Sequence, residues 1–189
     1  MKKGLTFLNS SFCVLRSYFI IFPVRILGVD PGSITTGFGV IDYERGKLLL
    51  VEQGAIGTRR GAELPERLGV IHDGLSEVIV RTRPQAIAIE TPFAGKNVSS
   101  LIQLAHARGV VLLAARAAAL EIFEYPPSSV KSAVVGYGRA EKEQVAKMVR
   151  MLIPGCGSMK MSADATDALA IAICHAHTSG TAARLKIRA

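Results

Sequence analysis

The stretch ILGVDPGSITTGFGVI, residues 26–41, decides how the chain folds. An apolar run ends in one acid, Asp30, after which the chain turns at Pro31-Gly32 and a second apolar run begins. Two short apolar runs joined by a Pro-Gly turn predict two consecutive buried strands. Asp30 has three interpretations at this point: a turn-forming residue, the floor of a phosphate loop, or the first ligand of a metal site.

Outward from this stretch, the apolar pattern predicts further strands and then helices. Residues 25–29, 36–43 and 48–58 predict three strands of an antiparallel meander. Helices are predicted at 64–81, 98–120, 128–135, 140–153 and 162–177, with short strands at 86–89 and 122–125. This order predicts the α/β class, with an RNase H-like mixed five-stranded sheet flanked by helices. A doubly wound Rossmann sheet fits less well, because its first strand would lead directly into a helix.

Composition and charge predict a single domain with two atypical ends. The chain has 189 residues, 49% of them hydrophobic, and a net charge of +8, which favours a polyanionic partner. Residues 25–178 are expected to form the domain, and residues 179–189 a flexible basic tail. Residues 1–24 are expected to be a disordered extension or an over-long start, with Val24 as the true initiator. The apolar stretch 18–24 is far shorter than the ~20 residues of a membrane span, so no membrane partner is expected. Three cysteines without zinc-site spacing predict reduced thiols in a cytoplasmic protein.

Carboxylates that follow apolar strands are the most informative chemical feature of the sequence. Asp30 and Glu90 each end a buried-type strand, and such strand ends can face one crevice. Asp164 and Asp167 lie three residues apart near the start of the last predicted helix, which places both on one helix face. The helix dipole could explain Asp164 and the turn could explain Asp30, but Glu90 has no such local explanation. Four carboxylates from three elements predict a site for hard divalent cations, of the kind that serves phosphodiester hydrolysis.

A series of motifs in order resembles a known family. The motifs are VDPGS with TGFGVI, AIAIE followed by F and KN, then ARGV, VKSAVVGYGRAEKEQV and DATDALAIAI. With this order and spacing, residues 25–179 resemble RuvC, the family of Holliday-junction resolvases. The resemblance implies that Asp30, Glu90, Asp164 and Asp167 are catalytic and hold two Mg²⁺ ions per subunit, with Mn²⁺ as an alternative. It also implies a homodimer that makes paired symmetric nicks in four-way junction DNA during recombination and repair, leaving 5′-phosphate ends. RuvA and RuvB, the branch-migration proteins, are the implied further partners.

The same resemblance suggests which residues contact DNA. Phe93 matches an aromatic residue that stacks on a base at the opened junction, although a loop Phe is more often a core residue. Lys96 and Asn97 follow in the same loop and are expected at the DNA backbone. The basic residues Lys131 and Lys142 match positions near the active site, where they would neutralise a phosphate, although a lysine is more often simply solvated. Arg139 replaces a small polar residue of many relatives. It is expected to remove an N-cap and to add a phosphate contact.

Two other classes of protein share parts of this pattern. Sugar kinases and actin-like ATPases also place an Asp before a Gly/Ser/Thr turn, but they need a second domain and a second phosphate loop, for which this chain has no room. A catalytically silent nucleic-acid-binding relative would keep the fold without the convergence of the acids. The predicted helix 98–120 is rich in small residues and is a candidate for the dimer face, with Ala114 and Ala118 as test positions, unless it is buried under other helices. With Asp30 as a metal ligand, the glycines of residues 26–41 are expected to serve a tight turn between strands and not to bind a nucleotide.

Overall fold

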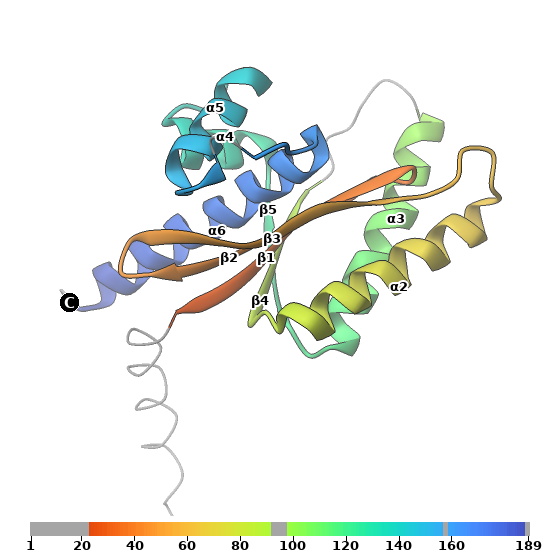
Figure 1. Cartoon of the computed structure of the whole chain (residues 1–189), viewed down its shortest axis with the longest axis horizontal. Helices are drawn as coiled ribbons and strands as arrows, with labels where there is room; N and C mark the ends of the chain where they lie inside the picture. Colours follow the sequence, from red (N-terminus) through yellow and green to blue (C-terminus); the bar gives the residue numbers. More distant parts are fainter. Residues whose placement is uncertain (1–22, 92–97, 157–158, 188–189) are drawn as a thin grey trace, which may run out of the picture.

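The computed structural model describes residues 23–91, 98–156 and 159–187, and within them the predicted order of strands and helices is confirmed (Figure 1). The elements are β1 (Val24–Asp30), β2 (Thr35–Glu44), β3 (Lys47–Gly57), α2 (Leu64–Thr82), β4 (Ala86–Glu90), α3 (Val98–Ala117), β5 (Glu121–Tyr125), α4 (Pro127–Val135), α5 (Lys142–Leu152) and α6 (Ala163–Ile187).

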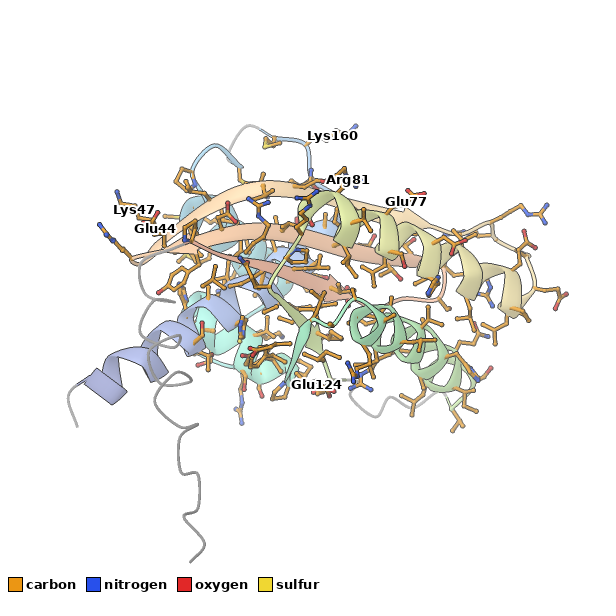
Figure 2. The ribbon with its side chains drawn as sticks, turned by 90° about the horizontal axis from the view of Figure 1, so that it is seen from below. Glu44, Lys47, Glu77, Arg81, Glu124 and Lys160 are labelled. Atoms are coloured by element: carbon orange, nitrogen blue, oxygen red, sulfur yellow. The ribbon has the colours of Figure 1, made fainter. Side chains whose placement is uncertain are left out.

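The strands form one mixed sheet in the order β3-β2-β1-β4-β5. β1 pairs antiparallel with β2, and β2 with β3, whereas β4 is parallel to both β1 and β5. Arg45 and Gly46 both have positive φ (50° and 86°), the conformation that a two-residue hairpin turn requires. Figure 2 shows Glu44 and Lys47 together at this turn, at the end of the hairpin away from the start of α2. The predicted RNase H-like architecture is confirmed.

Side-chain alternation along the strands divides the core into two halves, one on each face of the sheet. Leu27 and Val29 of β1 pack on one face with residues of α2 and α3. Ile26, together with Ala88 of β4, packs on the other face with residues of α4, α5 and α6. The sheet is therefore covered on both faces, and the even-numbered residues of β1 and β4 face α6.

Three glycines allow α6 to lie directly on the sheet. A Cβ atom on Gly28 would come within 2.1 Å of the Ala168 carbonyl oxygen, and one on Gly37 within 2.1 Å of the Asp164 carbonyl oxygen. A Cβ on Gly39 would collide with Leu169 at 2.6 Å. The expectation that the glycines serve the turn between strands is therefore wrong for these three, which lie inside β1 and β2. It holds for Gly32, whose Cβ would be 2.1 Å from the Thr35 carbonyl oxygen in the turn.

Two helices differ from the expectation. α6 was predicted to end at residue 177 because the following residues lack apolar periodicity, but it runs on to Ile187 through most of the predicted tail. Gly180 helps to seat this extension, since a Cβ there would be 2.4 Å from the Tyr43 hydroxyl. Ala114 was a candidate for a dimer face, but it is buried within the chain's own core beside α2 and the sheet. By length and composition α3 could cross a membrane, a test that core helices also pass, and here α3 contacts α2 and β5.

Candidate metal centre

Asp30 and Glu90 end two neighbouring parallel strands. β1 and β4 are paired up to Val29 and Ile89, so the next residue on each strand is one of the two acids. Glu90 lies two positions after Ala88, whose side chain packs in the core on the α6 face. Asp30 lies two positions after Gly28, where a Cβ would point at Ala168 of α6, so both acids face α6 as well. The predicted proximity of these two strand ends is confirmed.

Asp164 and Asp167 reach the same place from α6. Ser162, the first residue of the predicted helix 162–177, is the N-cap, because its hydroxyl oxygen accepts a hydrogen bond from the Ala165 N–H (3.1 Å). The Asp164 backbone lies over Gly37, and Gly37 is the residue that pairs with Asp30 across β1 and β2. The close approach of α6 to the glycines thus places the first turn of the helix beside the strand ends.

The four acids interact electrostatically. Burial, followed by the charges of Asp167 and Glu90, raises the pKa of Asp30 from 3.8 to about 7, while Lys142 opposes the shift and Asp164 adds to it. Burial and the charge of Asp167 likewise raise the pKa of Glu90, against the charges of Lys142 and Lys131. Carboxylates with raised pKa values that share one location are typical of functional sites.

The donor chemistry of this group fits a hard divalent cation, because every donor is a carboxylate oxygen. The donor types suit a cation, but the side chains are not positioned to coordinate one. Within residues 23–91, 98–156 and 159–187, no group of three acidic, histidine or cysteine side chains is arranged to hold a metal ion. Electrostatic coupling acts over longer distances than coordination does, so the two observations are compatible. One carboxylate is already paired, since Lys142 Nζ lies 3.0 Å from Asp167 Oδ2.

The two predicted basic residues lie beside the acids. Lys142 is largely exposed, and its hydrogen bond to Asp167 raises its pKa. Lys131 is half-buried on α4, close enough to influence Glu90. Exposed pairs of this kind contribute little to stability, so their position matters more for the charge of the site than for the fold.

Arg139 does not affect the helix in the way predicted. It was expected to remove the N-cap of the following helix, but the N-cap of α5 is Glu141. The Glu141 N–H donates to Gln144 Oε1 (2.9 Å), as in a capping box, so capping does not depend on residue 139. Arg139 itself is exposed. Its predicted phosphate contact stays a prediction.

Three predicted DNA contacts, Phe93, Lys96 and Asn97, lie outside the described residues. Two other polar side chains make structural contacts within the described residues. His175 is buried and bonded to the Tyr125 hydroxyl (2.8 Å), and burial lowers its pKa to about 4. Arg108 supports packing, since it binds Glu124 of β5.

The sequence reading missed Arg67, a buried arginine of α2 that binds the turn after Asp30. Its position on an otherwise apolar helix face, between Leu64 and Ile71, was the available signal.

Comparison with known proteins agrees with the fold and the motifs. The family model "Crossover junction endodeoxyribonuclease RuvC" matches residues 26–175. The protein of that name from Chloroflexus aggregans is 45% identical over 164 residues, which cover 87% of this chain and 99% of the relative. The one from Syntrophotalea carbinolica is 51% identical over 156 residues, 82% of this chain and 94% of the relative. The solved structure "T. thermophilus RuvC in complex with Holliday junction substrate" aligns with a TM-score of 0.77 and 34% identity, covering 84% of this chain and 96% of that chain. The chain belongs to the RuvC family of crossover junction endodeoxyribonucleases.

Proposed function

We propose that this chain resolves Holliday junctions by Mg²⁺-dependent hydrolysis of two opposed strands, with Asp30, Glu90, Asp164 and Asp167 as the metal ligands. The observation that carries the proposal is the placement of the first turn of α6 over Gly37, beside Asp30 and Glu90. Four acids gathered in this way destabilise the fold unless a cation compensates their charge. Membership of the RuvC family supplies the class of reaction.

In the proposed reaction, bound metal ions would supply an activated water and neutralise charge on the leaving oxygen. Two Mg²⁺ ions per subunit are proposed, with Mn²⁺ as an alternative. The chain's own contribution is to hold the carboxylates on two strands and one helix that cannot move independently. Lys142 and Lys131 add positive charge beside Glu90, which reduces the repulsion between the acids and an incoming phosphate.

Substrate binding is proposed to use the basic surface around this site. The net charge of +8 favours a polyanion. Phe93 is proposed to stack on a base of the opened junction, with Lys96, Asn97 and Arg139 at the backbone. Cooperation with RuvA and RuvB and a cytoplasmic location are proposed from the family resemblance.

A homodimer is proposed because two symmetric cuts require two sites. An apolar stripe on α3 is available for it: Val98, Ile102 and Leu113 are 67%, 51% and 61% exposed, and helical spacing places them on one side with Gly109. This stripe lies opposite the helix face that carries the buried Ala114. Exposed large apolar residues gathered on one helix face are typical of an interaction surface.

Cleavage of labelled DNA tests the proposed function. The wild type is expected to nick a four-way junction in Mg²⁺ and to leave a linear duplex of the same sequence intact. Asp30→Asn is expected to cut at least about 10²-fold more slowly, the scale on which single transition-state groups act. Equal cutting by both proteins would reject the metal assignment, and loss of junction preference in the wild type would reject the function. Nucleotide-dependent phosphotransfer without cutting would favour the kinase alternative.

The dimer is tested by a charge placed in the stripe. Leu113→Asp is expected to raise the dimer dissociation constant at least about 10-fold, because it buries a charge at an apolar contact. Met151→Asp, at an equally exposed position on α5 across the sheet, is the matched control. Sedimentation velocity over a range of concentrations measures both. A Leu113→Asp protein that dimerises like the wild type would remove this interface.

A further inference from the structure

The turn after Asp30 is held by side chains from three other elements. The Ser33 carbonyl oxygen accepts a hydrogen bond from the Thr58 hydroxyl (3.1 Å) and one from Arg67 Nη1 of α2 (3.3 Å). The Ser33 hydroxyl also lies 3.4 Å from the Gln103 side-chain oxygen of α3. The β3–α2 loop is joined to the same turn, because the Thr58 N–H donates to the Ile34 carbonyl (2.8 Å). This loop and the turn after Asp30 therefore form one surface at the carboxylate end of the sheet.

Arg67 is an unusual member of this surface. It is only 9% exposed, yet none of the described residues provides an acid within ion-pair distance of its guanidinium. Its Nη1 contacts to Ser33, at 3.3 Å and 3.5 Å, are long, and its Nε is buried without a hydrogen-bond partner. Arg25 shows the usual arrangement, since its guanidinium has Asp42 as a bidentate partner. A buried arginine without a counter-ion is costly, so an anion from outside the chain would compensate its charge.

The β3–α2 loop adds exposed positive charge beside Arg67. Arg59 and Arg60 are both exposed, and the acids of the same segment are Glu63 and Glu66. Glu66 is 3.6 Å from Arg59 in an exposed pair, and Glu63 lies at the N-terminus of α2, where a carboxylate favours the helix dipole. Arg60 and Arg67 are therefore the basic residues of this surface that the structure does not pair with an acid.

We propose that Ser33, Arg60 and Arg67 bind a backbone phosphate of the DNA on the α2 side of the carboxylates. The proposal rests on the proposed function, because it takes junction DNA as the ligand. Ser33 is three residues after Asp30, so the two Cα atoms are at most about 11 Å apart. A short separation of this kind allows one DNA strand to reach both the carboxylates and the proposed phosphate site. Arginine suits this task because its fork of donors matches phosphate oxygens.

The test measures equilibrium binding of a fluorescent four-way junction in EDTA, where no cutting occurs, over a series of salt concentrations. Arg60→Ala and Arg67→Gln are each expected to weaken binding about 5- to 10-fold and to reduce the slope of log K against log salt by about 0.9, the loss of one phosphate contact. Arg60→Lys, which keeps the charge, is expected to retain the slope. Arg45→Ala is the matched control, since Arg45 is exposed like Arg60 and has only a weak pair with Glu44 (3.9 Å), but lies in the β2–β3 turn at the opposite end of the same hairpin.

The outcomes separate this proposal from its alternatives. Arg60→Ala with the affinity and salt slope of the wild type would overturn it. An Arg67→Gln protein that binds normally but cuts slowly at saturating junction would also overturn it, since Arg67 would then only position the turn. If Arg67→Gln does not fold, the comparison of junction affinity and salt slope between Arg60→Ala and Arg45→Ala decides whether the proposal stands. A wild type without junction preference would reject the proposed function, yet the slope change on linear duplex would still measure the phosphate contact.

Discussion

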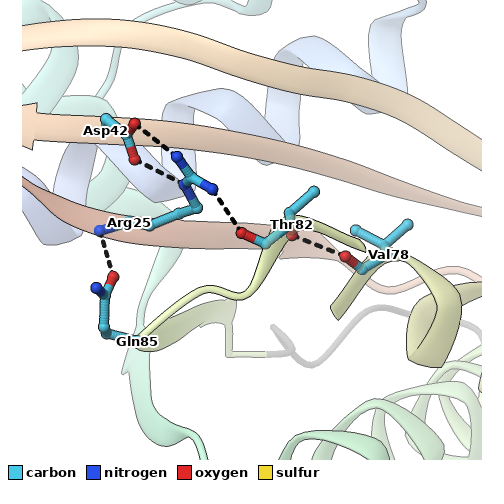
Figure 3. A network of polar contacts seen from close by, with 5 residues as sticks. All are labelled: Arg25, Asp42, Val78, Thr82 and Gln85. Carbon is cyan, nitrogen blue, oxygen red and sulfur yellow. Dashed lines mark hydrogen bonds and ion pairs between the residues drawn. The ribbon is translucent and has the colours of Figure 1, made fainter. Parts of the chain in front are cut away.

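The two ends of β1 hold charged side chains in opposite ways. At its start, Arg25 donates from Nε and Nη2 to the two carboxylate oxygens of Asp42 (2.8 Å and 2.9 Å) and from Nη1 to the Thr82 carbonyl (2.7 Å), while its N–H donates to Gln85 (2.6 Å) (Figure 3). At its end, Asp30 faces three further acids, with Lys142 as the main opposing charge. The charge of Arg25 is fully paired by hydrogen bonds, whereas the charge of Asp30 is surrounded mainly by charges of the same sign.

This difference separates the part of the strand that stabilises the fold from the part that serves the chemistry. The network at Arg25 joins β1 to β2, to the last residue of α2 and to Gln85 before β4, so it fixes the sheet and the crossover together. Burial and the neighbouring acidic charges raise the pKa values of Asp30 and Glu90, so the charged forms of these two side chains work against the fold. Such a cost is expected where a ligand supplies the missing charge.

The largest effect is expected from the contact that gathers the acids. Gly37→Ala should lower the free energy of unfolding by more than about 3 kcal/mol, because the new methyl group meets the Asp164 backbone and no side-chain rotation relieves the clash. It should also abolish the stabilisation of the protein by Mg²⁺, since the first turn of α6 is displaced. Urea unfolding with and without Mg²⁺ measures both effects.

Gly57→Ala on the neighbouring strand is the control, because a Cβ there meets nothing within 4 Å. It is expected to be neutral or slightly stabilising. If Gly37→Ala unfolds at the urea concentration of the wild type, the close packing of α6 is not what holds the acids in place.

A smaller effect, opposite in sign, is expected from removing the charge at Asp30. The folded-state pKa of Asp30, about 7, is above its ordinary value of 3.8, so the folded state binds the proton more tightly. The associated stability is present below pH 3.8 and is lost as pH rises to about 7. Asp30→Asn should therefore stabilise the metal-free protein at pH 8 by roughly 3 kcal/mol and hardly at all near pH 4.

Thermal unfolding in EDTA at several pH values measures this gain. Addition of Mg²⁺ should reverse the order, because a ligand that binds only the folded wild type stabilises it. An Asp30→Asn protein that is less stable than the wild type at pH 8 in EDTA would contradict the conclusion that the charge of Asp30 destabilises the folded state.

The smallest effect is expected at the end of β1 that holds Arg25. Arg25→Met should destabilise the fold by about 2 kcal/mol, because Asp42 loses both bonds to a charged donor. The cutting rate at saturating junction should be unchanged at a temperature where the variant is fully folded. Chemical unfolding and single-turnover cleavage measure the two quantities. The double variant Arg25→Met/Asp42→Asn should recover part of the loss, and a fall in the cutting rate of either protein would show that the two ends are coupled.

Much of this arrangement could be predicted from local sequence. Strand and helix order follows from side-chain periodicity, and the last helix was predicted to begin at residue 162, where the structure has its N-cap, Ser162. The N-cap of α5 was missed, because the capping residue is Glu141, whose N–H donates to the side chain of Gln144, one turn later in the helix. The sequence left open whether Ala114 lies at a dimer face or under other helices, because α3 is apolar on both faces and composition does not show which face meets α2; the structure shows that Ala114 is buried.

By itself, the sequence determined the order of the elements and the positions of four acids at strand ends and at a helix start, because these depend on neighbours along the chain. Only the tertiary structure decided which acids lie close enough to influence one another electrostatically. Their proximity depends on how α6 is seated on Gly28, Gly37 and Gly39, residues far from it in the chain whose missing side chains allow the contact. Only the tertiary structure also shows that none of the described residues provides Arg67 with an acidic partner, because the side chains around it come from segments that are distant in the chain.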